Sequence, residues 1–69
     1  MSDFRPIAVD EITAATITGI SVSSLQKMRV RGDGPHYAKI GNRVRYRLVD
    51  LDEFISERIV RSTSAAQAA

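Results

Sequence analysis

Glycine-containing breaks divide this chain into short segments, and the division limits the folds that it can adopt. The breaks lie at Gly19, at Gly32-Asp33-Gly34-Pro35 and at Gly41-Asn42. Glycine readily takes the left-handed backbone conformation that ends a helix or forms a tight turn. The chain has 69 residues and no cysteine, so we expect one small domain that is held together by packing alone.

The first two segments have the patterns of short helices. Asp10 is a suitable N-cap for a helix over 11–18, which Gly19 would end. Ser21 is a suitable N-cap for a second helix over 22–30. The apolar spacing places Ala14 and Ile17 on one face of the first helix and predicts that Leu25 and Met28 of the second face inward. Ile20, between the two helices, is expected to be a buried anchor.

The remaining parts of the chain are a lead-in, a third helix and a tail. We predict a lead-in over 1–8, a domain over 9–60 and a disordered, low-complexity tail over 61–69. A helix is expected over 49–59, with acidic residues in its first turn as the helix dipole favours. Its apolar stripe would consist of Leu51, Phe54, Ile55 and Ile59.

A β-hairpin is predicted between the second and third helices. A two-residue loop, Gly41-Asn42, would place Ile40 opposite Arg43, whereas a three-residue loop would place it opposite Val44. Only the three-residue loop gathers the apolar residues on one face, so we predict that register. It leaves Asn42 and Arg43 at the tip, and the opposite face then carries Tyr37, Lys39, Arg45 and Arg47.

Positive charge is concentrated in the middle of the chain. The segment from Lys27 to Arg47 has seven Lys/Arg residues and one acid, Asp33, a net charge of +6, whereas the rest of the chain has a net charge of −4. A basic surface on so small a domain is typical of a protein that binds nucleic acid, because it replaces the counterions of the phosphate backbone.

The two predicted helices have the spacing of a helix-turn-helix motif. Gly19 would let the chain reverse, and the second helix would enter the major groove of DNA, where Gln pairs with adenine and Lys or Arg with guanine. Arg29 is expected to reach a backbone phosphate. The alternative is an ordinary helical hairpin with a charged outer face. The predicted DNA contacts of this helix are Ser23, Ser24, Gln26, Lys27, Arg29 and Arg31.

The basic hairpin is placed where a helix-turn-helix protein carries a wing. Arg43 at its tip is suited to a narrow minor groove, which attracts arginine. A solvated hairpin whose charges prevent edge aggregation is the alternative, although the hairpin contains no acid from His36 to Arg47. The predicted DNA contacts of the wing are Lys39, Asn42, Arg43, Arg45 and Arg47.

The order and spacing of these pieces resemble the small MerR-like winged helix-turn-helix of phage excisionases and AlpA-type regulators. The resemblance covers 9–55, and so about two thirds of the chain. It is carried by Ala14-Ala15, Gly19-Ile20-Ser21, Leu25, Gly32-Asp33-Gly34-Pro35, Lys39-Ile40-Gly41, Val44-Arg45-Tyr46, Asp50-Leu51 and Phe54-Ile55. It implies an α+β fold in which the second helix and the wing bind double-stranded DNA. The long dimerisation helix of full MerR regulators is not expected to follow.

The resemblance also implies a biological role. An excisionase is a recombination directionality factor that bends attachment-site DNA and contacts an integrase, and an AlpA-like transcriptional regulator is the alternative. We expect one monomer per short site, with copies associating along DNA. A more distant alternative is an adaptor that binds an acidic protein surface. We predict no catalysis, cofactor, metal site, small-molecule substrate or membrane association, and a cytoplasmic protein of a bacterium or phage.

Overall fold

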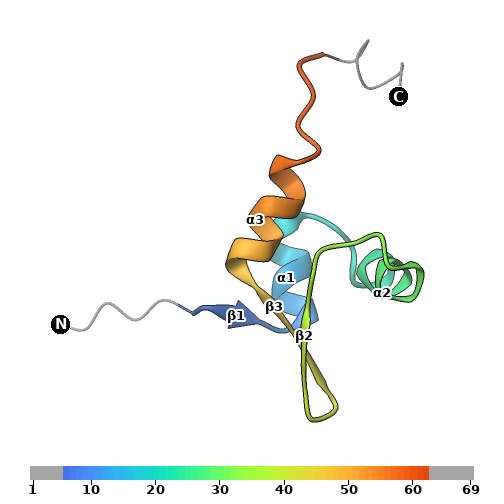
Figure 1. The fold of residues 1–69 in the computed structure, drawn as a ribbon, viewed down its shortest axis with the longest axis vertical. Coiled ribbons are helices and arrows are strands. Elements are labelled where there is room, and N and C mark those ends of the chain that lie inside the picture. Colours follow the sequence, from blue (N-terminus) through green and yellow to red (C-terminus); the bar gives the residue numbers. More distant parts are fainter. Residues whose placement is uncertain (1–5, 63–69) are drawn as a thin grey trace, which may run out of the picture.

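The two N-terminal helices begin and end where their capping signals predict. In the computed structural model, which describes residues 6–62, α1 spans Glu11–Thr18 and α2 spans Val22–Arg31 (Figure 1). Asp10 and Ser21 cap them, since their side chains accept hydrogen bonds from the backbone N–H groups of Thr13 and Ser24. Gly19, with φ 78°, ends α1 in the left-handed conformation and turns the chain towards α2.

A three-stranded antiparallel sheet follows the helix pair, with the order β1-β3-β2. Strand β2 spans Ala38–Ile40 and β3 spans Arg43–Arg47. Strand β1, at Ala8–Val9, pairs with the second half of β3. The sequence pattern does not predict β1, because a strand of two residues has no periodicity of its own. The α+β winged helix-turn-helix architecture is confirmed.

The hairpin register differs from the prediction. The loop contains two residues, Gly41 and Asn42, so Ile40 pairs with Arg43 and Lys39 with Val44. Gly41 has φ 64°, and no residue other than glycine has a positive φ in the described chain, which is the pattern of a type II′ turn. The local turn chemistry therefore determines the register, and the three-residue loop was wrong.

The two-residue loop changes which side chains share a face of the hairpin. Because directly paired residues lie on one face, Lys39 joins Val44 and Tyr46 on the face towards the core. Ile40 joins the arginines on the other face and is 65% exposed. The predicted apolar face is therefore incomplete, and the buried part of the hairpin is Tyr46 with half-buried Val44.

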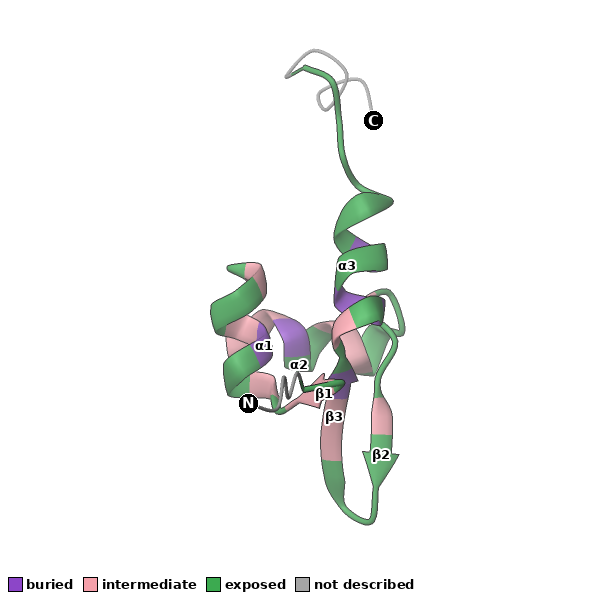
Figure 2. Cartoon of the chain, turned by 90° about the vertical axis from the view of Figure 1, so that its left-hand side faces the viewer, coloured by how far each residue is buried: buried purple, intermediate pink, exposed green. Residues whose placement is uncertain are grey.

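The core is formed where α1, α2, β3 and α3 meet (Figure 2). Ala14, Leu25 and Tyr46 have no exposed surface, and Leu51 is 2% exposed. The absence of a large side chain at Ala14 lets α1 approach its neighbours closely. Small residues in the first helix and one aromatic ring from the wing therefore fix the helix pair against the hairpin.

Helix α3 spans Leu48–Ser56 and lies at the opposite end of the molecule from the hairpin tip (Figure 1). Only part of its predicted stripe is inward, since Leu51 and Phe54 are buried whereas Ile55 is 42% exposed. Ile59 lies beyond the end of the helix and is 74% exposed, so its predicted packing was wrong. The predicted tail over 61–69 lies outside the described residues except for 61–62.

Gly34→Ala is expected to lower the free energy of unfolding by about 1–3 kcal/mol, as overpacking does. A Cβ atom at Gly34 would lie 2.6 Å from Cβ of Met28, which is attached to the α2 backbone and cannot easily move away. The backbone of Gly34 does not have a positive φ, so alanine could adopt it. Without the contact with Met28, the substitution would therefore be expected to stabilise the protein. Urea unfolding measures the difference, and a variant as stable as the wild type would contradict the close approach.

Candidate nucleic-acid interface

Helix α2 presents one polar, basic face to solvent. Gln26 and Lys27 are exposed in its middle, with Ser23 one turn before them and Arg31 one turn after Lys27. Arg31 pairs with Asp33 at 3.0 Å, and both side chains are more than half exposed, so the pair exchanges easily with solvent or phosphate. Four of the six residues predicted for this helix therefore share its accessible face.

The N-terminus of α2 is suited to a phosphate group. Its first turn contains no acidic residue, so the positive end of the helix dipole is not neutralised by a side chain there. Ser24 is half-buried, and its hydroxyl accepts a hydrogen bond from the Ser21 hydroxyl at 2.9 Å. Ser24 therefore belongs to the cap of the helix, whereas Ser23 is exposed.

Arg29 is held inside the protein, contrary to the expectation that it reaches towards phosphate. Its Nη1 donates to Oε1 of Glu11 at 3.0 Å and to the hydroxyl of Tyr46 at 2.9 Å, and its side chain is 20% exposed. The hydrogen bond to Tyr46, and then that to Glu11, raise the pKa of Arg29. Arg29 thus ties α1, α2 and β3 together and fixes the angle between the helix and the wing.

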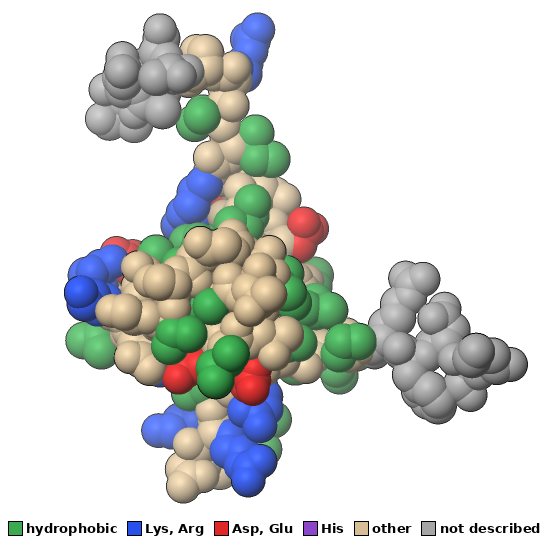
Figure 3. Space-filling view, turned by 180° about the vertical axis from the view of Figure 1, so that it is seen from behind, with side chains coloured by type: hydrophobic (Ala, Val, Ile, Leu, Met, Phe, Trp, Pro, Cys, Tyr) green, Lys and Arg blue, Asp and Glu red, His purple; other side chains and the backbone are tan. Residues whose placement is uncertain are grey.

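The tip half of the wing is the freest basic part of the hairpin. Lys39, Asn42 and Arg43 are all exposed. Figure 3 shows Lys and Arg side chains gathered over the hairpin at the bottom of the view and over the side of the molecule where α2 lies. Acidic and hydrophobic side chains separate the two groups on this face.

The base of the wing uses its arginines differently. Arg45 is half-buried, and its Nη1 donates to the backbone carbonyl of Val44 at 2.8 Å. Arg47 is the N-cap residue of α3 and bonds both carboxylate oxygens of Asp50, at 2.7 and 2.9 Å. Asp50, predicted as an acid in the first turn of this helix, is 8% exposed and fixes the junction of the wing and α3.

The Arg47–Asp50 pair is expected to make folding sensitive to acid. The hydrogen bond from Arg47 lowers the pKa of Asp50, so the pair stabilises the fold above the unfolded-state pKa and this stabilisation is lost as the pH falls below about 4. Asp50→Asn should therefore narrow the difference in urea midpoint between about pH 7 and about pH 3. Asp52→Asn, at an exposed position of the same helix, is the control: it also removes one carboxylate, but it should narrow this difference in urea midpoint less than Asp50→Asn does. An unchanged difference in Asp50→Asn would contradict this assignment.

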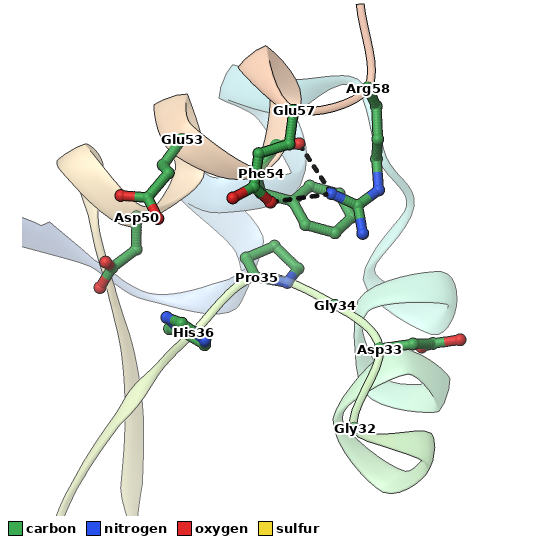
Figure 4. A pocket seen from close by; sticks show the side chains of 10 residues that line it. All are labelled: Gly32, Asp33, Gly34, Pro35, His36, Asp50, Glu53, Phe54, Glu57 and Arg58. Carbon is green, nitrogen blue, oxygen red and sulfur yellow. Dashed lines mark hydrogen bonds and ion pairs between the residues drawn. The ribbon is translucent and has the colours of Figure 1, made fainter.

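A groove between α3 and the α2–β2 connection has the opposite charge to the wing. Figure 4 shows the acidic side chains along it, with Phe54 under the guanidinium of Arg58, 3.7 Å from the ring centre. The charged residues that line it are Asp33, Asp50, Glu53, Glu57 and Arg58. Its four acids outnumber Arg58 and would repel a phosphate backbone, so this groove is less suited to DNA than the exposed basic residues of α2 and the wing tip.

Two other classes of site are absent from residues 6–62. These residues contain no group of three or more His, Cys, Asp or Glu side chains arranged to hold a metal ion. None of their helices has both the length and the apolar character needed to cross a bilayer.

Comparison with known protein families identifies the domain. The sequence model of a helix-turn-helix domain family matches residues 13–59, which include α2, the hairpin and α3. The chain belongs to this family. It is a family of small excisionase- and AlpA-like helix-turn-helix proteins. A comparison with curated proteins found no match to the chain.

Membership of the helix-turn-helix family implies sequence-specific binding of double-stranded DNA. Glu11, which bonds both Gln26 and Arg29, was not among the predicted site residues. Glu11 precedes these residues by 15 and 18 positions, so no local pattern connects them. Its only sequence signal is an acid in the first turn of α1, which is also the ordinary preference of a helix N-terminus.

Proposed function

We propose that this protein is an excisionase of the MerR-like winged helix-turn-helix type. It binds attachment-site DNA of a phage or other mobile element and acts with an integrase as a recombination directionality factor. The observation that supports it is the combination, within a domain of the excisionase- and AlpA-like family, of a basic helix face on α2 and a basic wing tip. Such a role places it in the bacterial cytoplasm, on DNA.

The two elements have different tasks in this proposal. Helix α2 acts as the recognition helix and lies in the major groove, where Gln26 and Lys27 contact base edges and Ser23 approaches the backbone. Arg43 and Lys39 extend from the wing to the sugar-phosphate edge or into the adjacent minor groove. Arg31 and the N-terminus of α2 add phosphate contacts. Binding needs no covalent chemistry.

Arginines that are bonded to carboxylates set the geometry of this DNA contact rather than touching DNA. Arg29 links the recognition helix to Tyr46 of β3, so the helix and the wing are presented at one fixed angle. Arg47 and Asp50 hold the base of the wing on α3. One monomer then covers a short site, and neighbouring copies add along repeated sites.

The proposal is tested on the host element's attachment region. A gel-shift titration with labelled attachment DNA is expected to show a complex from which an unlabelled scrambled duplex displaces little of the labelled DNA. An excision assay with purified integrase, with and without this protein, then tests its role: excision that depends on the protein supports the excisionase assignment. Binding to the attachment region with no effect on excision would contradict that assignment but not DNA binding.

An AlpA-like transcriptional regulator is the second candidate, because the same family includes such proteins. It would use the same helix and wing on a promoter. The two roles predict different targets, so sequencing of DNA bound to the protein in cells separates them. Enrichment of promoters over attachment sites, with a change in the adjacent transcripts, would favour the regulator.

A further inference from the structure

Glu11, the first residue of α1, bonds two side chains of the recognition helix at the same time. Its Oε1 accepts from Nη1 of Arg29 at 3.0 Å, and its Oε2 accepts from Nε2 of Gln26 at 3.1 Å. We infer that Glu11 is a positioning residue that fixes the amide of Gln26 to read adenine. The inference rests on the proposed binding of DNA through α2 and adds to it the base that this position selects.

The orientation of the Gln26 amide follows from the chemistry of its partner. A carboxylate can only accept hydrogen bonds, so it bonds the NH2 end of the amide and excludes the oxygen end. One N–H of Gln26 is therefore directed to Glu11. The carbonyl oxygen and the second N–H remain for another partner.

The remaining amide edge matches adenine and conflicts with guanine. Adenine offers an acceptor, N7, and a donor, N6, which pair with the N–H and the carbonyl oxygen of a glutamine amide. Guanine offers two acceptors, N7 and O6, so its O6 would face the amide oxygen. If Glu11 were absent, the amide could turn over and present its NH2 group to guanine O6.

The carboxylate of Glu11 is itself anchored to the core. Arg29 donates to both Glu11 and the hydroxyl of Tyr46, whose side chain is fully buried. The Arg29 guanidinium also lies 5.8 Å from the centre of the Tyr37 ring. A chain of hydrogen bonds thus runs from Tyr46 through Arg29 and Glu11 to Gln26 at the surface, and it limits the motion of the amide.

The test measures base preference at one position of the binding site. Preferred duplexes are selected from a random library with the wild-type protein, and Gln26→Ala identifies the base pair whose preference is lost. Dissociation constants are then measured with adenine or guanine at that position. Glu11→Ala is expected to reduce the adenine-over-guanine ratio by at least about fivefold, the lower end of what one bidentate contact supplies. Adding Glu11→Ala to Gln26→Ala should change the ratio no further.

Glu57→Ala is the matched control. Glu57 is the C-cap residue of α3, its side chain is 62% exposed, and it pairs with Arg58 rather than with a residue of α2. It is expected to leave the ratio unchanged. An unchanged ratio in Glu11→Ala, or a wild-type preference for another base at the Gln26 position, would overturn the inference while leaving DNA binding intact. A wild-type protein that selects no duplex would overturn the proposed function itself.

Discussion

Leu25→Ala is expected to lower the free energy of unfolding by about 2–5 kcal/mol. Leu25 has no exposed surface and packs in the cluster that joins α2 to α1, β3 and α3. A domain of this size has a total stability of only about 3–10 kcal/mol, so the variant is expected to be largely unfolded at 37 °C or to melt far below the wild type. Urea denaturation followed by circular dichroism measures the loss.

Ile59→Ala is the matched control for this core substitution. Ile59 is also a large aliphatic residue, but it is 74% exposed and lies beyond the end of α3. Its replacement should change the stability by no more than about 0.5 kcal/mol. Equal losses in the two variants would contradict the burial of Leu25 and the packing of α2 on the core.

Replacing Lys39 and Arg43 together by alanine is expected to weaken binding to every duplex. Each lost phosphate contact lowers the slope of log affinity against log salt by about 0.9, which corresponds to roughly tenfold in affinity at about 0.1 M salt. The double variant should therefore lose up to about 100-fold in affinity, with little change in discrimination between sequences. Fluorescence anisotropy over a salt series measures both quantities.

Arg58→Ala provides the charge control for the wing. It removes one cation from the end of the molecule opposite to the wing tip, where its guanidinium lies over Phe54. A salt slope close to that of the wild type is expected. If the wing variant kept the wild-type slope, or lost binding to one sequence only, the wing would not be a backbone contact.

The sequence predicted the parts of the fold that depend on local chemistry. The N-caps Asp10 and Ser21 and the left-handed Gly19 were all expected, and each has that role in the structure. Such signals need only the residues within one turn of the helix end. The same reasoning identified the exposed face of α2, because helical spacing alone places Gln26 and Lys27 together.

The predicted hairpin register was wrong, because apolar alternation was given more weight than the chemistry of the turn. Gly41 followed by Asn42 favours a two-residue loop with a positive φ at its first position, which the structure adopts. The cost is an exposed Ile40, which the protein tolerates at the hairpin tip. Turn preference was the stronger signal in a hairpin this short.

The functions of individual arginines depended on tertiary contacts that no local pattern reveals. Arg29 and Arg47 belong to the same basic segment as Lys27 and Arg43, yet each is bonded to a carboxylate. Their partners lie in α1 and α3, on either side of the basic segment in sequence. Net charge therefore overestimates the surface available to phosphate, because some of the basic residues are bonded to carboxylates of the same chain.

Chemical-shift mapping by NMR tests most directly whether DNA is contacted by both α2 and the wing tip. A selected duplex is titrated into isotope-labelled protein, and the amide shifts of residues 6–62 are followed. The largest changes are expected along α2 and at the wing tip, with α3 from Asp52 to Ser56 little affected. Shifts concentrated on α3 and the acidic groove, or no shift with any duplex but binding to an acidic protein surface, would contradict the account.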